Sequence, residues 1–78
     1  AAQLRELVAN AMNLVAQPEL FMQQLKQAAK ELNVPLKELF GYLRMGLMGA
    51  LQGPGIIELL TTLGQDESHA RLTHLLHL

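Results

Sequence analysis

Apolar residues recur three and four positions apart along most of this chain, which is the spacing that places them on one side of a helix. In the N-terminal part, polar residues such as Gln3, Glu6 and Asn10 fall between them. This pattern predicts a helix over 2–16. Its apolar stripe consists of Leu4, Leu7, Val8, Ala11, Leu14 and Val15.

Prolines divide the next part of the chain into two helices. Pro18 suits the first turn of a helix, where its missing N–H would have no partner, and the residue before Pro35 is pushed toward extended geometry. We therefore expect helices over 18–33 and 35–51. Their apolar stripes are Phe21, Leu25, Ala28 and Leu32 in the first, and Leu36, Leu39, Phe40, Leu43, Leu47 and Leu51 in the second.

Glycines mark the last two helices. The Gly53-Pro54-Gly55 turn precedes a helix expected over 54–63, and Gly64 provides a left-handed stop after it. Asp66 suits the N-cap of a fifth helix over 66–77. The inward positions of these helices are Ile56, Leu59, Leu60, Leu63, Leu72, Leu75 and Leu76, and the exposed row is Glu67, Arg71 and His74. With about five short helices and no strand candidate, the sequence predicts a compact all-α bundle.

Composition narrows the class of protein. The chain has 78 residues, 50% of them hydrophobic, with no cysteine and a formal net charge of −1. A core of this size yields only about 3–5 kcal/mol, so we expect the single domain 1–78 to be a fragment of a larger protein. The charge argues against an autonomous nucleic-acid binder, and no apolar run approaches the roughly 20 residues of a membrane span. No signal-peptide pattern is present, and we expect an intracellular protein with no DNA partner and no membrane contact.

One cation, Arg44, stands in the apolar and glycine-rich stretch "YLRMGLMGALQGPGII". Helical spacing puts Lys37, Gly41 and Met48 on the same side as Arg44. An arginine fork beside the unpaired N–H groups of the next helix would suit an unstacked RNA base, against which Met48 and Ile56 would pack. In the alternative, Arg44 extends its charged end into solvent and the glycines only permit close helix packing. Spacing alone leaves both interpretations open.

The run "LFGYLRMGLMGALQGPGIIELLTTLG", followed by "ARL", resembles the C-terminal anticodon-binding region of bacterial-type glutamyl-tRNA synthetases. In that family a Leu-Arg step, a glycine five residues on and a Gly/Thr-Pro-Gly turn precede a Leu-Leu-x-x-Leu-Gly ending. Upstream, "QPELFMQQLKQAAKELNVPLKELF" is similar to the helix pair that leads into this motif. The resemblance implies the C-terminal anticodon-binding subdomain of a class I aminoacyl-tRNA synthetase.

The resemblance also implies roles for particular residues. In the family, the arginine of the Leu-Arg step and the residues of the proline turn contact the first two anticodon bases. That role carries over to Arg44, Gly53, Pro54 and Ile56, with Met48 beside them. The third base is read by an arginine of a preceding helical subdomain, which no part of this chain matches.

The parent protein that the resemblance implies is an ATP-dependent glutamate-tRNA ligase in a cytoplasm of bacterial or organellar type. Its partner would be tRNA(Glu), and whether tRNA(Gln) is also charged stays open. The nucleotide-binding catalytic domain does not match any part of this chain, so no catalytic residue and no cofactor is expected here. ATP and magnesium would belong to the parent enzyme, and the present domain would pack against its preceding helical subdomain.

Departures from the family's usual residues leave a second function open. Tyr42 stands where the family often has proline, and Met48 where threonine is common. The alternative is a helical protein-interaction module, derived from a synthetase, that no longer contacts RNA. Such a module would bury its methionine-rich face, with Met45 and Met48, against a protein partner, because methionine adapts to irregular surfaces.

Several cations outside the Leu-Arg step are candidates for phosphate contacts. Lys37 and Arg71 are the first of these, and Lys26 and Lys30 are further candidates. Lys26 and Lys30 form a like-charge pair four residues apart, for which a solvated helix face is the simpler explanation.

The histidines of the last segment invite a metal interpretation, which the spacing does not support. His74 and His77 are close enough to share a helix face, and His69 precedes them. A structural zinc site usually needs four ligands, and this chain has no cysteine to complete one. We therefore predict no metal site.

Overall fold

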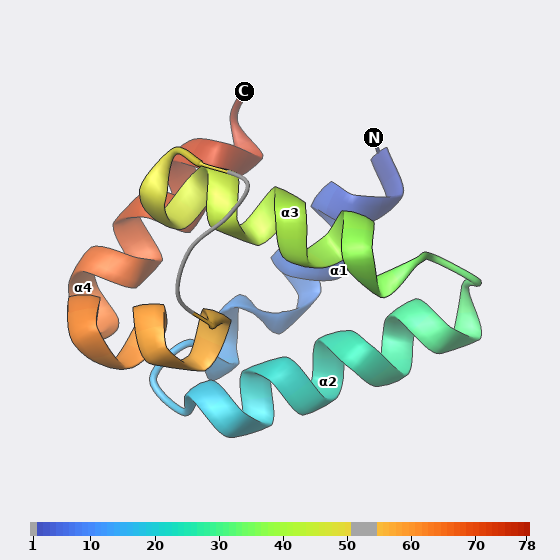
Figure 1. Cartoon of the computed structure of the whole chain (residues 1–78), viewed down its shortest axis with the longest axis horizontal. Coiled ribbons are helices and arrows are strands. Elements are labelled where there is room, and N and C mark those ends of the chain that lie inside the picture. The colour runs from blue at the N-terminus through green and yellow to red at the C-terminus, as the bar shows by residue number, and fades with distance from the viewer. Residues whose placement is uncertain (1, 51–54) are drawn as a thin grey trace.

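The computed structural model describes residues 2–50 and 55–78, and all the regular structure in these residues is helical. Four α-helices follow one another, namely α1 (Ala2–Ala11), α2 (Pro18–Glu31), α3 (Leu36–Met48) and α4 (Ile56–Leu76). A short 3₁₀ helix, η1 (Met12–Leu14), continues α1. In Figure 1, α2 and α3 lie opposite each other and α4 bends around one end of the bundle. The predicted all-α bundle is confirmed, with four helices in the described residues rather than five.

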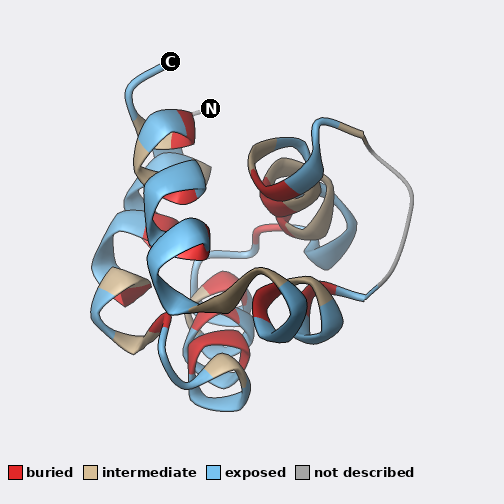
Figure 2. Cartoon of the chain, turned by 90° about the vertical axis from the view of Figure 1, so that its left-hand side faces the viewer, coloured by how far each residue is buried: buried red, intermediate tan, exposed pale blue. Residues whose placement is uncertain are grey.

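The core lies between the inward sides of all four helices, as the buried residues in Figure 2 show. Helix α3 packs most extensively against α4, and the backbone of Gly46 lies directly against the side chain of Leu75. A Cβ atom on Gly46 would lie 2.6 Å from Cδ2 and 3.0 Å from Cβ of Leu75. The absence of a side chain at Gly46 therefore sets the distance between the two helices. The largest side chains with no exposed surface are Phe21, Leu25, Leu39, Leu43, Leu47, Leu72 and Val8.

Two leucines expected in the core lie outside it. Leu32 and Leu36, assigned to the apolar stripes of the second and third helices, are 49% and 43% exposed. Leu32 follows the last residue of α2 and Leu36 begins α3. Helical spacing does not predict which side chains are buried at these two positions, because the chain leaves one helix there and turns into the next.

Helix α2 ends in a Schellman motif built on an asparagine. Asn33 has a φ of 58°, and its N–H donates to the carbonyl of Lys30 at 3.3 Å. The N–H of Val34 donates to the carbonyl of Ala29 at 2.8 Å, and both side chains are buried. These two bonds satisfy carbonyls that the helix end leaves without a helical partner, and the apolar contact usually accompanies them. The break predicted before Pro35 is confirmed, and α2 ends at Glu31, two residues before the predicted end at 33.

Helix α3 ends at Met48, three residues before the predicted end at 51. Gly49 takes the left-handed conformation, with φ 74° and ψ 17°, and its N–H donates to the carbonyl of Met45 at 3.0 Å. A glycine just past the last helical residue is the usual end of a helix. The sequence-based prediction instead placed the end at the Gly53-Pro54-Gly55 turn, of which Gly53 and Pro54 lie outside the described residues.

Helix α4 is bent at Gly64, where the sequence predicts a break between two helices. Gly64 has φ 83° and ψ 168°, so its positive φ is confirmed but it is not in the left-handed helical region. Ser68 is fully buried and donates from its Oγ to the carbonyl of Leu60 at 3.4 Å, across the bend. Asp66 makes no side-chain hydrogen bond within the described residues, so its predicted capping role is wrong. The serine hydroxyl, rather than an N-cap, connects the two halves of α4.

We expect Gly64→Ala to lower the free energy of unfolding by about 1–2 kcal/mol, because its φ and ψ belong to a region that is essentially limited to glycine. No described atom lies within 4 Å of the Cβ that alanine would add, so the loss would report backbone strain. Gly55→Ala is the matched control, since Gly55 is equally uncrowded among the described residues and has a φ of −60°. Urea unfolding followed by circular dichroism measures both, and equal stabilities of the two variants would contradict the prediction.

Candidate nucleic-acid interface

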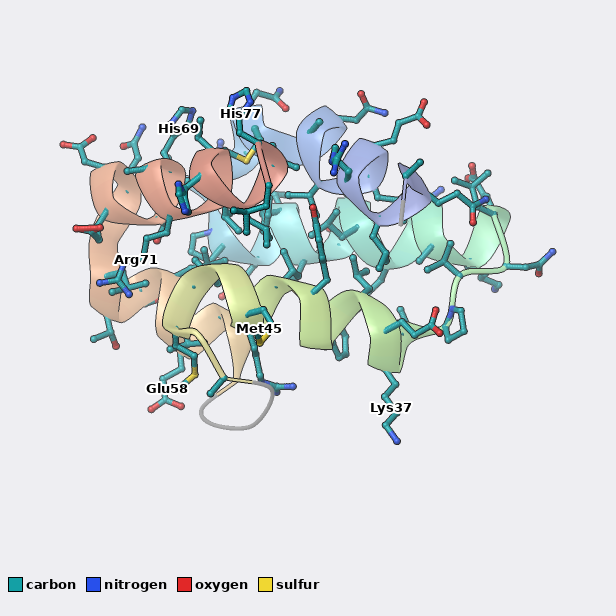
Figure 3. The ribbon with its side chains drawn as sticks, turned by 90° about the horizontal axis from the view of Figure 1, so that it is seen from above. Lys37, Met45, Glu58, His69, Arg71 and His77 are labelled. Carbon is teal, nitrogen blue, oxygen red and sulfur yellow. The ribbon has the colours of Figure 1, made fainter. Side chains whose placement is uncertain are left out.

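One side of α3 carries a mixture of cations and exposed methionines. We call the residues Lys37, Gly41, Arg44, Met45 and Met48 the α3 face. Lys37 is exposed, Arg44 is half-buried, and Met45 and Met48 are 47% and 38% exposed. Figure 3 shows Lys37 and Met45 extending from the same side of the bundle. This face therefore offers positive charge and soft apolar surface together.

Arg44 lies closer to the end of its helix than the sequence-based boundary indicates. Arg44 is four positions before Met48, the last residue of α3, which corresponds to about 6 Å of helix rise. The predicted boundary at 51 would have placed it about 10 Å from the end. The arginine is thus one turn away from the chain segment that leads to α4.

The start of α4 supplies backbone donors of its own. Gly55 precedes the helix in an extended conformation, with φ −60° and ψ 156°, and it has no side chain to cap the first N–H groups. The first N–H groups of a helix lack helical partners and carry partial positive charge, which attracts acceptor groups. Glu58 lies in this first turn and extends on the same side as Met45 (Figure 3). The helix start is therefore suited to acceptor atoms of a ligand, with one carboxylate nearby.

Two predictions concern Ile56: helical spacing places its side chain inward, and the resemblance gives it a contact with an anticodon base. Ile56, predicted to contact an anticodon base, is only 5% exposed and belongs to the core. Ile57, which the sequence analysis did not select, is 41% exposed. The exposed isoleucine side chain at the start of α4 is therefore that of Ile57, while Ile56 offers only its backbone there. The helical spacing thus predicted the burial of Ile56 correctly.

Two further residues of the predicted site, Gly53 and Pro54, lie outside the described residues. The structure accordingly gives no position for the centre of the predicted turn. Of the predicted base-reading residues, Arg44 and Met48 are placed on one exposed face of α3. Their contact with RNA stays a prediction.

Arg71, a candidate for phosphate contact, has a structural contact in the bundle. Its Nη1 donates to the main-chain carbonyl of Leu47 in the last turn of α3, and its Nε pairs with Oε2 of Glu67 at 3.1 Å. The Leu47 carbonyl is one of those that a helix end leaves without a helical partner. The guanidinium of Arg71 therefore caps α3, and Glu67 balances its charge. Lys37 lies ten residues away from Leu47 along α3, so the two phosphate candidates are at opposite ends of the helix.

The histidines lie on another side of the molecule. His69 and His77 extend from the side of α4 opposite to Met45 and Lys37 (Figure 3). Within residues 2–50 and 55–78, no three histidine, aspartate or glutamate side chains are arranged to hold a metal ion. In the same residues, no helix combines the length and the apolar character needed to cross a bilayer.

Comparison with known proteins assigns the chain to a family. No curated protein and no solved structure matches the chain. A family model described as an anticodon binding domain matches residues 1–76, which is almost the whole sequence. That match covers α1 to α4 and supports recognition of a tRNA anticodon within a synthetase. The chain belongs to the anticodon binding domain family.

Proposed function

We propose that this domain reads the first two bases of the glutamate anticodon, as the C-terminal part of a glutamate-tRNA ligase. The anticodon binding domain match over residues 1–76 supports the general role, and the Leu-Arg to Gly-Pro-Gly resemblance supports the glutamate assignment. The structural observation that carries the proposal is the position of Arg44. It is half-buried, one turn before the end of α3, on a face with two exposed methionines.

This arrangement suits a base that is not stacked in a helix. Single-stranded RNA bases are recognised at their edges by arginine and backbone groups, while apolar side chains pack against the rings. Arg44 would supply a planar pair of donors, and the exposed side chains of Met48 and Ile57 would contact the ring. Lys37, about two turns before Arg44, would meet a phosphate. The chemistry of aminoacylation, with ATP and magnesium, would take place in a different domain of the same enzyme.

We expect the 78-residue chain to bind the anticodon stem-loop of tRNA(Glu) weakly, with a dissociation constant in the micromolar range or above. Its net charge is −1, and few phosphates can be neutralised. An NMR titration at several salt concentrations measures this affinity, which should fall with salt. Stem-loops changed at either of the first two anticodon bases serve as controls and should bind more weakly. Nanomolar affinity at physiological salt, or equal binding of all stem-loops, would contradict the proposal.

The alternative function is a protein-interaction module that uses the same exposed side chains. Its supporting observation is that Met45, Met48 and Ile57 are each at least 38% exposed. Binding of a protein partner through these side chains would be insensitive to salt, because it would rest on apolar contact. The salt series of the stem-loop titration therefore separates the two functions.

A further inference from the structure

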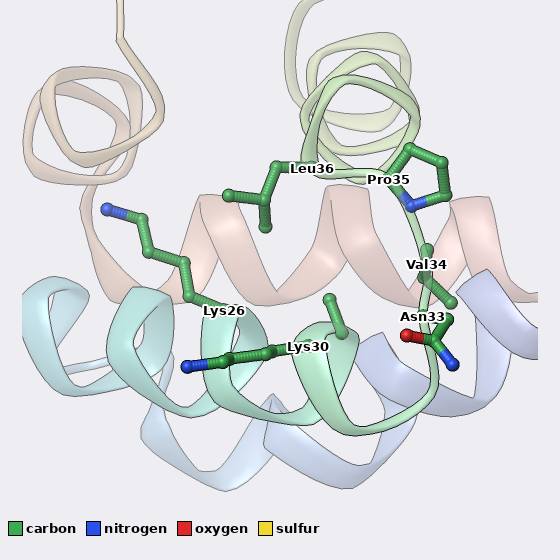
Figure 4. Close-up of a pocket in the computed structure, with 7 residues that line it drawn as sticks. Lys26, Lys30, Asn33, Val34, Pro35 and Leu36 are labelled. Carbon is green, nitrogen blue, oxygen red and sulfur yellow. The ribbon is translucent and has the colours of Figure 1, made fainter.

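A groove of about 500 Å³ lies where α2 ends and α3 begins. Its volume falls in the range of small-molecule binding sites. Figure 4 shows Lys26 and Lys30 on one side of the groove and the segment from Asn33 to Leu36 on the other. None of these residues was given a role in base reading above, so the groove is a separate feature of the fold.

The α2 side of the groove carries uncompensated positive charge. Lys26 and Lys30 are both exposed, one helical turn apart, and their side chains extend in similar directions (Figure 4). Neither Lys26 nor Lys30 is paired with a carboxylate of the described residues. Two like charges at this spacing destabilise a helix by a few tenths of a kcal/mol. An anion in the groove would offset that repulsion.

The floor of the groove is apolar and held in place by the end of α2. Ala29 and Val34 are buried, and the two backbone bonds of the Schellman motif join their segments. Leu36 is 43% exposed and lines the same groove. Asn33 is fixed with a φ of 58° at the rim, and its amide offers both a donor and an acceptor. The groove therefore combines a preformed apolar surface with one neutral polar group and two cations.

The groove lies near the elements that are proposed to read the anticodon. Lys26 reaches from α2 toward the first half of α4 (Figure 4), which carries Ile57 and the uncapped helix start. Leu36 belongs to α3, the helix that carries Arg44. A single strand of RNA whose bases meet the α3 face would thus have a second basic surface within the same domain.

We infer that this groove binds one further nucleotide of the single-stranded anticodon loop, with its phosphates at Lys26 and Lys30 and its base against Leu36 and Val34. The inference rests on the proposed function and adds a contact to it. An RNA strand fits better than an acidic peptide because the groove pairs cations with an apolar floor, and every base offers a flat apolar face to such a floor. Lys26 and Lys30 are separated by about 6 Å along the helix, so they can meet successive phosphates of an extended strand.

The test compares variants that remove one positive charge each. Lys26→Gln and Lys30→Gln should each weaken binding of the tRNA(Glu) anticodon stem-loop, and the double variant should bind about tenfold more weakly at low salt. The slope of log affinity against log salt should become shallower by about 0.7 for each lysine. Arg5→Gln is the matched control, since Arg5 is an exposed cation on α1, away from the groove. Lysine variants that behave like Arg5→Gln would overturn the inference.

A second pair of variants tests the apolar floor. Leu36→Ala should lower the affinity severalfold without changing the salt slope, whereas Leu32→Ala should leave it unchanged. Both leucines are more than 40% exposed, and Leu32 does not line the groove, so the pair is matched for exposure. Circular dichroism spectra confirm that both variants are folded. Equal affinities of Leu36→Ala and the unmodified chain would overturn base packing in the groove.

Two comparisons separate this inference from the proposed function. If stem-loops with changed anticodons are distinguished normally but the lysine variants have no effect, the groove inference fails and anticodon reading stands. If the lysine variants weaken binding while all anticodons bind equally, anticodon reading fails and the groove remains an RNA contact. Poly-glutamate serves as an acidic peptide probe. Lysine-dependent binding of poly-glutamate as tight as that of the stem-loop would overturn RNA as the occupant.

Discussion

Replacing Phe21 with alanine is expected to lower the free energy of unfolding by about 3–5 kcal/mol. Phe21 has no exposed surface and is the largest of the fully buried side chains, so its loss removes apolar contact and leaves a cavity. A core of this size yields about 3–5 kcal/mol in total, and the variant should therefore be largely unfolded at 25 °C. Urea unfolding of the unmodified chain and the variant, followed by circular dichroism, measures the difference.

Leu20→Ala is the control for this change. Leu20 precedes Phe21 in the same helix, but it is 45% exposed, and its truncation should cost less than about 1 kcal/mol. If Phe21→Ala unfolds at the same urea concentration as Leu20→Ala, the packing of α2 on the core differs from that described. The same unfolding curves also give the free energy of unfolding of the unmodified chain, which the binding experiments use.

Arg44→Lys is expected to reduce discrimination at the middle anticodon base by about 1–3 kcal/mol, or roughly 5- to 150-fold. Lysine keeps the positive charge but loses the planar fork that donates two parallel hydrogen bonds to a base edge. Attraction to phosphates should change little, so the salt slope should stay the same. The measurement is the ratio of affinities for the tRNA(Glu) stem-loop and for one changed at the middle base.

Arg44→Ala and Met45→Ala provide the comparisons for this prediction. Arg44→Ala should lose the same discrimination and, in addition, a small electrostatic attraction to RNA. Met45→Ala removes an exposed side chain from the same face and keeps the arginine, so discrimination should persist. If Arg44→Lys is well folded and discriminates as the unmodified chain does, Arg44 does not read a base. It would then belong to helix packing or to a protein interface.

Helical periodicity was sufficient to predict where most of the core lies. Leu39, Leu43 and Leu47 are fully buried as predicted, because they lie well inside a helix where the period of 3.6 residues holds. The predicted burial of Leu32 and Leu36 is wrong, because they lie at helix ends and the period carries no information about the path of the chain beyond a helix. There the chain turns at Asn33, which has a positive φ of 58°.

The candidate site was predictable in outline only. Helical spacing placed Arg44 and Met48 on one side of a helix, and the structure has both there. Helical spacing placed Ile56 inward, which is confirmed, whereas the resemblance gave the same residue a base contact for which its side chain is only 5% exposed. The cap that Arg71 provides joins Leu47 to a residue 24 positions away, and no local pattern could indicate it.

The hydrogen bond from Arg71 to the Leu47 carbonyl gives two distant parts of the chain a shared local stability. Amide protons near the end of α3 and in the second half of α4 should exchange with solvent in the same opening event, since melting either segment removes the partner of the other. The substitution Arg71→Gln should uncouple the two segments, and hydrogen exchange would detect this. The last turn of α3 would then exchange faster, while the amides of α1 and of the first half of α2 would keep their rates.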